Sequence, residues 1–122
     1  MCKDCDFAGM TFEAYEAFAL QNGDALARIP KLGHPVVYAV LGMAGEAGET
    51  TEKVKKVFRD GGGDFSPEVV GAIMNELGDV LWYVTAAAAA LGKSLEDVAQ
   101  ANIDKLTSRR ARGVVHGNGD NR

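Results

Sequence analysis

The chain has 122 residues, 47% of them hydrophobic and 25% charged, which suits one domain with a single core. Its 13 Lys and Arg against 17 Asp and Glu give a net charge of −4, which argues against a nucleic-acid-binding surface, since such domains are usually basic. The longest apolar run, residues 84–91, is far shorter than the roughly 20 residues that cross a bilayer. No apolar segment follows Met1, so we expect no signal peptide and a cytoplasmic protein.

Two cysteines, Cys2 and Cys5, form a CxxC motif near the start of the chain. A single CxxC could supply half of a zinc site, form a disulfide or redox pair, or lie in a frayed terminus. The histidines, His34 and His116, do not stand at zinc-finger spacing from it. We therefore favour a flexible N-terminus over residues 1–10.

Helices are predicted through residues 11–112. Thr11 is a suitable N-cap for the first. A connector with two prolines and a glycine, residues 28–35, separates it from the second helix. Proline is well placed in the first turn of a helix, so the second should begin at Pro35 and run to about Phe58.

A glycine-rich loop, residues 59–64, follows the second helix. It lacks the GK[ST] sequence of a phosphate-binding loop, so it is interpreted as a linker. Ser66 as N-cap and Pro67 in the first turn predict the start of a third helix, which should end near Gly92.

The fourth helix should begin at Ser94, because Asp97 three residues later completes a short version of the capping box. It is predicted to run to about Arg112, and the glycine-rich residues 113–122 to form an irregular tail. No segment has the alternating pattern of a strand. The fold class is therefore all-α.

Two pairs of acids dominate the candidate chemistry. Glu76 and Asp79 lie three residues apart in an apolar stretch of the third helix, and Glu46 and Glu49 have the same spacing on the second. Two such charges about 5.5 Å apart repel by roughly 3 kcal/mol at an effective dielectric near 20, so four acids together need protons or cations. Oxygen ligands without His or Cys favour Mg²⁺ or Mn²⁺. We predict that the four acids meet and bind divalent metal, although either pair alone would also fit a solvated helix face.

Cations accompany the acids. Lys53 shares the face of Glu49, one turn later. A stripe on the fourth helix consists of Asn102, Lys105, Arg109 and Arg112. Metal and guanidinium groups together suit a di- or triphosphate. The stripe taken alone could equally complement the helix dipole.

These segments carry a resemblance to a known family. GEAGETTEKVKK, NELGDVLWYV and LGKSLEDVAQANIDKLTSRRARG closely resemble the MazG-like all-α nucleoside triphosphate pyrophosphohydrolases, over about residues 11–122. The order ExxE, spacer, ExxD is the metal motif of that family, and the ending is similar to short, single-domain members from bacteria and phages. The resemblance implies a four-helix bundle, assembled as a homodimer or homotetramer whose active sites are completed by neighbouring subunits.

The activity that the resemblance implies is hydrolysis between the α- and β-phosphates, giving a nucleoside monophosphate and pyrophosphate. Two or three Mg²⁺ or Mn²⁺ ions would be held by Glu46, Glu49, Glu76 and Asp79. Glu46 is our choice for removing a proton from the attacking water. The phosphate ligands would be Lys53, Asn102, Lys105, Arg109 and Arg112. Arg112 and the tail would either close over the site or stay outside it.

Substrate choice is implied to lie with the first helix and its connector, where the candidates are Phe18, Gln21, Asn22, His34 and Tyr38. Tyr83, on the acid face, is a further candidate for contacting the nucleotide. Asn22 stands where relatives often carry Thr, and Asn75 stands where an acid is frequent, so the substrate stays open. We favour dGTP or GTP. The alternatives are a dUTPase-like enzyme, a phosphoribosyl-ATP pyrophosphohydrolase and a non-enzymatic helical interaction module.

Overall fold

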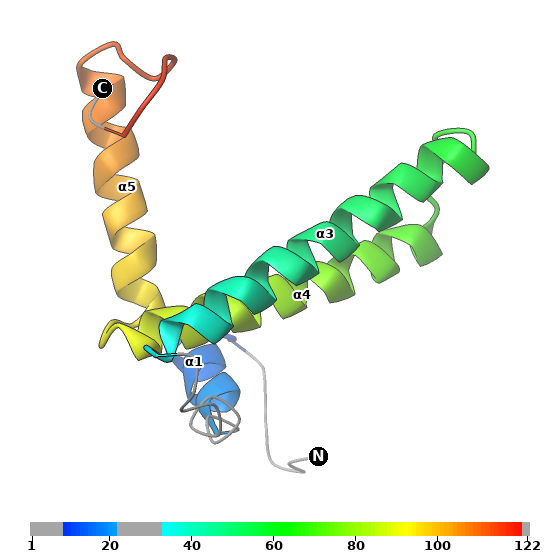
Figure 1. Ribbon diagram of the computed structural model, residues 1–122. Coiled ribbons are helices and arrows are strands. Elements are labelled where there is room, and N and C mark those ends of the chain that lie inside the picture. The colour runs from blue at the N-terminus through cyan, green and yellow to red at the C-terminus, as the bar shows by residue number, and fades with distance from the viewer. Residues whose placement is uncertain (1–8, 22–32, 121–122) are drawn as a thin grey trace.

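The computed structural model describes residues 9–21 and 33–120, and these form helices joined by short connections. The helices are α1 (Phe12–Leu20), α3 (Val36–Asp60), α4 (Pro67–Ala90) and α5 (Leu95–Ala111) (Figure 1). The described residues contain no strand, which confirms the all-α prediction. Cys2, Cys5 and Asn22 lie outside the described residues.

Polar side chains set the starts of three helices. Thr11, Ser66 and Ser94 each accept a hydrogen bond from the backbone N–H three residues later. Asp97 returns the bond at the start of α5, where its Oδ2 accepts from the Ser94 N–H at 2.9 Å. Such bonds satisfy N–H groups that have no partner within the helix. The helix ends accordingly lie close to those predicted from the sequence.

The longest helices, α3 and α4, pack against each other as an antiparallel hairpin (Figure 1). α1 contacts α4 and the start of α5, and α5 then projects away from the hairpin. The helices in the described part of one chain therefore do not all lie side by side as the expected bundle requires. The apolar residues of α5 do not form a single apolar face that could pack along the hairpin: Leu95 and Arg109 are buried, but Val98 and Ile103 are exposed.

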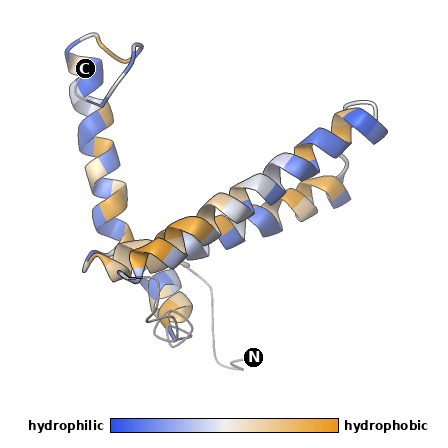
Figure 2. Cartoon of the chain, in the orientation of Figure 1, coloured by the Kyte–Doolittle hydropathy of each residue, from blue (hydrophilic) through white to orange (hydrophobic). Residues whose placement is uncertain are grey.

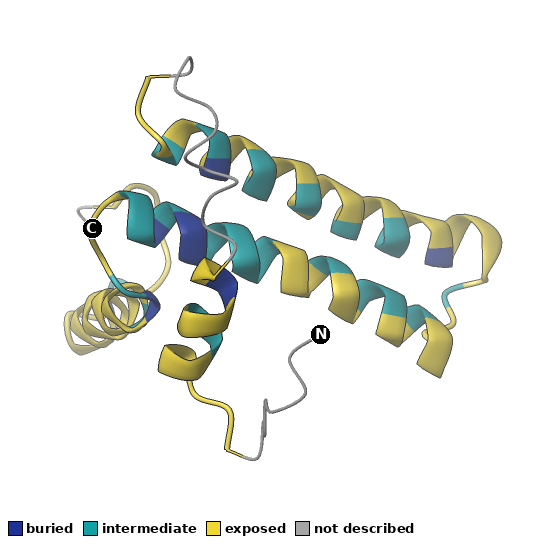
Figure 3. Cartoon of the chain, turned by 90° about the horizontal axis from the view of Figure 1, so that it is seen from below, coloured by how far each residue is buried: buried dark blue, intermediate teal, exposed yellow. Residues whose placement is uncertain are grey.

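Small side chains form the core where α1, the start of α3 and the end of α4 meet (Figure 3). The buried residues there are Ala19, Ala39, Thr85, Ala86 and Ala88. Thr85 is satisfied within α4, since its Oγ1 donates to the carbonyl of Leu81 at 2.8 Å. Glu16 fixes α1 to α5, because its Oε1 accepts from the Leu95 N–H at 3.2 Å. Most of the buried residues therefore lie at one end of the hairpin, while Val57 is buried near the other end.

Large apolar side chains remain exposed along the helices. Phe58 is 65% exposed, Leu41 61%, Met74 60% and Ile103 56%. Hydrophilic residues gather in the second half of α3, beyond the acids (Figure 2). No helix in the described part of the chain is long and apolar enough to span a membrane.

Candidate active site

Acids from α3 and α4 meet in the middle of the hairpin. One carboxylate oxygen from each of Glu46, Glu49 and Glu76 lies within 4.8 Å of the others. Oxygens that share one Mg²⁺ at about 2.1 Å are roughly 3 to 4 Å apart, so small side-chain rotations would bring these three onto one cation. The sequence predicted that all four acids meet, and the structure brings these three together.

The fourth acid, Asp79, lies one turn after Glu76 and is exposed. It is outside the group of three, but its charge acts on them: partial burial and then the negative charge of Asp79 are the main causes that raise the pKa of Glu46. The charges of Glu49 and Glu76 raise this pKa further. Neighbouring negative charges raise the pKa of a carboxylate because they repel its charged form, and a bound cation would reduce this repulsion. The donor set and its electrostatics both fit a divalent metal.

A lysine partly neutralises the cluster. Lys53 Nζ lies 2.9 Å from Glu76 Oε1, and the Glu76 side chain is only 12% exposed. The hydrogen bond and charge of Glu76 raise the pKa of Lys53, as does the charge of Glu49. Lys53 therefore stands at the acids, on the face of α3 where the sequence predicted it.

Tyrosines line the other side of the acids. The Tyr83 ring lies over Gly42 of α3. Burial is the main cause that raises the pKa of Tyr83, followed by Tyr38 and then by the charges of Glu46 and Asp79. Tyr83 therefore lies beside the acids, as its position on the acid face of α4 predicted.

Comparison with known proteins bears directly on this arrangement. Residues 38–114 match the MazG nucleotide pyrophosphohydrolase domain, a span that includes all four acids, Lys53 and Tyr83. The chain belongs to the MazG family. Members of this family are nucleoside triphosphate pyrophosphohydrolases, so the protein is an enzyme of that class. Family membership sets aside the non-enzymatic interaction module.

The chain is also similar to the Gene 37 protein of Mycobacterium phage L5. The two are 48% identical over 85 residues, which cover 70% of this chain and 75% of the phage protein. No solved structure matches the chain.

One residue near the four acids of α3 and α4 was not predicted from the sequence. Tyr15 of α1 donates from its hydroxyl to the carbonyl of Gly78, at 3.5 Å. Burial and then the charge of Asp79 raise the pKa of Tyr15. No local sequence signal points to this contact, because it depends on how α1 crosses α4.

The predicted phosphate ligands on α5 do not reach the four acids within one chain, because α5 projects away from the hairpin. Lys105 and Asn102 are exposed. Arg109 is buried against the tail, where its Nη2 donates to the carbonyl of Asp120 at 3.1 Å. Arg112 donates from Nε to the Ser108 hydroxyl at 3.2 Å.

The candidates for base selection are spread over the molecule. Phe18 and Gln21 lie on or just after α1 and are exposed. His34 uses its Nδ1 to accept from the Val36 N–H at 3.2 Å, before α3. Tyr38 packs near Tyr83, with ring centroids 6.3 Å apart.

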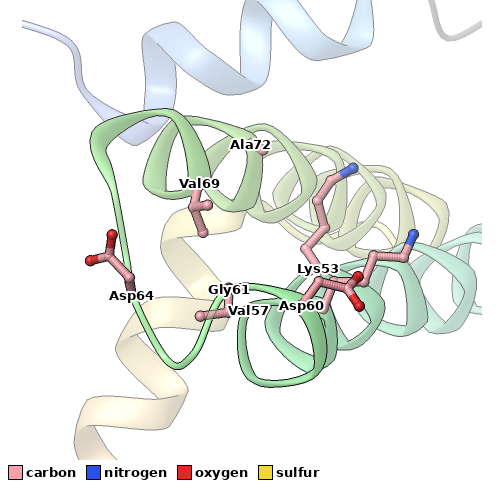
Figure 4. Close-up of a pocket in the computed structure, with 8 residues that line it drawn as sticks. Lys53, Val57, Asp60, Gly61, Asp64, Val69 and Ala72 are labelled. Atoms are coloured by element: carbon pink, nitrogen blue, oxygen red, sulfur yellow. The ribbon is translucent and has the colours of Figure 1, made fainter.

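A pocket of about 330 Å³ opens at the far end of the hairpin (Figure 4). Val57 of α3 and Val69 of α4 form apolar walls, and Asp64 lies on the connecting loop. Lys53 lines this pocket and also pairs with Glu76, so it connects the pocket to the acids.

Proposed function

We propose that this MazG enzyme uses Mg²⁺ or Mn²⁺ to hydrolyse a nucleoside or deoxynucleoside triphosphate between the α- and β-phosphates. The products are the nucleoside monophosphate and pyrophosphate. The observation that carries the proposal is the convergence of Glu46, Glu49 and Glu76 within 4.8 Å, from two segments far apart in sequence. Asp79, one turn after Glu76 on α4, is the proposed fourth ligand.

The four acids would hold two or three divalent ions. When bound, such ions offset phosphate charge and lower the pKa of water. Glu46 is proposed to accept the proton of the attacking water, because its carboxylate lies in the group of acids that would hold the ions. Tyr83 is proposed to contact the nucleotide beside the acids.

Lys53 is proposed to exchange partners during the cycle. Without metal its ammonium pairs with Glu76. When cations take over the charge of Glu76, the same flexible side chain is free to bind a phosphate oxygen and stabilise charge in the transition state. Its partial exposure leaves it room to move.

The remaining phosphate ligands are proposed to come from a neighbouring subunit of a homodimer or homotetramer. They are Asn102, Lys105, Arg109 and Arg112. The support is the direction of α5, which projects away from the α3–α4 hairpin that carries the acids. The exposed apolar side chains on α3, α4 and α5 provide surface for such an association.

A purine triphosphate, dGTP or GTP, is the proposed substrate, and neither nucleic acid nor membrane is an expected partner. The phage relative supports a role in the cytoplasm of an infected host cell. A dUTPase-like activity and phosphoribosyl-ATP hydrolysis are the alternatives that the same site would allow.

The test is a panel of ribo- and deoxynucleoside triphosphates and phosphoribosyl-ATP, incubated with Mn²⁺ and assayed for pyrophosphate and for the monophosphate formed. We expect pyrophosphate with dGTP and GTP, and none after Glu76→Gln. Glu52→Gln is the matched control, because Glu52 lies on the same hairpin but is exposed and paired with Lys55. Release of inorganic phosphate in place of pyrophosphate, or full activity of Glu76→Gln, would contradict the proposal.

A further inference from the structure

Gly42 occupies a position where no side chain fits. A Cβ atom built there would lie 2.2 Å from Cε1, 2.4 Å from Cζ and 2.6 Å from Cδ1 of Tyr83, well inside the 3.0 Å that real Cβ atoms keep. Two other glycines of α3, Gly45 and Gly48, would meet nothing within 4 Å. The absence of a side chain at position 42 therefore has a specific consequence, which is that the Tyr83 ring lies directly on the backbone of α3.

The ring is also held from two other directions. Tyr38, one turn before Gly42 on α3, has its ring centroid 6.3 Å from that of Tyr83, at an angle of 59°. Trp82 packs edge-on against Tyr83, with centroids 5.0 Å apart and an angle of 88°. A methyl group at position 42 could not be accommodated without moving the ring relative to these neighbours.

The position of this ring bears on the acids. Glu46 lies one turn after Gly42 on the same face of α3, and Asp79 lies one turn before Tyr83 on α4. The Tyr83 ring over Gly42 therefore lies at the edge of the acid cluster, one helical turn from Glu46 on α3 and from Asp79 on α4.

We propose that Gly42 is a positioning residue for the hydrolysis: by carrying no side chain it seats the Tyr83 ring against α3, at the edge of the acid site where the nucleotide binds. This inference rests on the proposed role of Tyr83 as a nucleotide contact. Reactions of this kind are sensitive to placement, since a displacement of about 1 Å can cost about 100-fold in rate.

The test compares Gly42→Ala with Gly45→Ala, two changes that add the same methyl group to the same helix and favour helix formation equally. Trp82 is the only tryptophan of the sequence, so its fluorescence reports the packing of Tyr83 without reference to activity. We expect Gly42→Ala to shift the Trp82 emission and to lower kcat/KM about tenfold or more. Gly45→Ala should change neither.

A double variant separates positioning from general damage. In Gly42→Ala/Tyr83→Ala the added methyl group has no ring to displace, so kcat/KM should equal that of Tyr83→Ala alone. This comparison also decides the matter if Gly42→Ala by itself fails to fold, because the double variant should then fold again. A further loss of kcat/KM or of folding in the double variant would overturn the inference.

Two other results would overturn it: wild-type emission and kcat/KM in Gly42→Ala, or equal losses in Gly42→Ala and Gly45→Ala. Wild-type kcat and KM in Tyr83→Ala would remove its premise while leaving the hydrolysis itself intact. Failure of the wild-type enzyme to release pyrophosphate contradicts the proposed function instead, and the Trp82 emission still reads the Gly42 contact in that case.

Discussion

Among the individual residues, Glu46 has the clearest electrostatic consequence for stability. Partial burial and the charges of Asp79, Glu49 and Glu76 raise its pKa above the ordinary value for a glutamate. The folded state therefore holds a proton on Glu46 at a pH where the unfolded chain has lost it. Folded stability therefore falls as the pH rises from the unfolded pKa through the raised folded pKa.

Glu46→Gln should accordingly raise the melting temperature of the metal-free protein at neutral pH, because the neutral amide removes this repulsion. The gain should shrink as the pH falls below the ordinary pKa of a glutamate, where both proteins are uncharged at this position. Calorimetry in the presence of a chelator, over a series of pH values, measures the difference. A gain that is independent of pH would exclude the charge of Glu46 as its cause.

Replacing Lys53 should have the opposite effect on stability to replacing Glu46. Lys53→Met removes the partner that lies 2.9 Å from Glu76, so we expect a lower denaturation midpoint in the metal-free protein. Mn²⁺ should recover more stability in this variant than in the wild type, because the cation no longer competes with an ammonium group. Lys55→Met is the control, since its partner Glu52 is exposed. Equal responses of the two variants to Mn²⁺ would contradict this account.

Local spacing was sufficient to predict some of these residues and not others. The four acids and Lys53 could be placed on facing sides of two helices because the helical period is fixed. The hydrogen bond of Tyr15 to Gly78 and the packing of Tyr83 on Gly42 depend on how the helices cross. Crossing geometry is set by packing between distant segments, which no short window of sequence records.

At the scale of helices, α5 depends strongly on its N-terminus, because little of its length is buried. The Ser94 hydroxyl accepts from the Asp97 N–H at 3.0 Å, and the Leu95 N–H donates to Glu16 of α1. Ser94→Ala should destabilise the protein by about 1 kcal/mol, the usual cost of losing an N-cap. Urea unfolding followed by circular dichroism measures the change.

Thr107→Ala, at an exposed position later in α5, is the matched control and should change stability little. Equal effects of the two substitutions would show that capping does not set the stability of α5. The starts of α1, α4 and α5 could be predicted from sequence because these caps are local. The direction of α5 could not, because its exposed apolar residues carry no information about which surface covers them.

For the molecule as a whole, the separation of the acids from the polar and cationic stripe of α5 is the central feature. The acids lie within the α3–α4 hairpin, while Lys105 lies on α5, which projects away from it. Exposed apolar side chains such as Leu41 and Met74 line the outside of the hairpin. Burying such side chains against a second copy would contribute favourable free energy, at roughly 25 cal/mol per Å². Both features are accounted for if the functional unit contains more than one chain.

Subunit mixing tests this arrangement directly. Glu76→Gln should inactivate the acids of its own chain, and Lys105→Ala should weaken the phosphate site that its chain supplies to a neighbour. If Lys105 acts in its own chain, no mixture of the two variants contains an intact site. If it acts across the interface of a homodimer, each mixed dimer regains one intact site, and about a quarter of all sites recover when equal amounts exchange freely.

We therefore expect pyrophosphate release to return when Glu76→Gln and Lys105→Ala proteins are mixed after partial denaturation and refolded together. Each variant refolded alone is the control for recovery during handling, and sedimentation analysis establishes that the mixed species are oligomers of the 12.9 kDa chain. Recovery in the mixture, with none in either variant alone, requires that α5 of one subunit reach the acids of another. If the mixture is oligomeric but no more active than its components, Lys105 either lies outside the active site or serves the active site of its own chain.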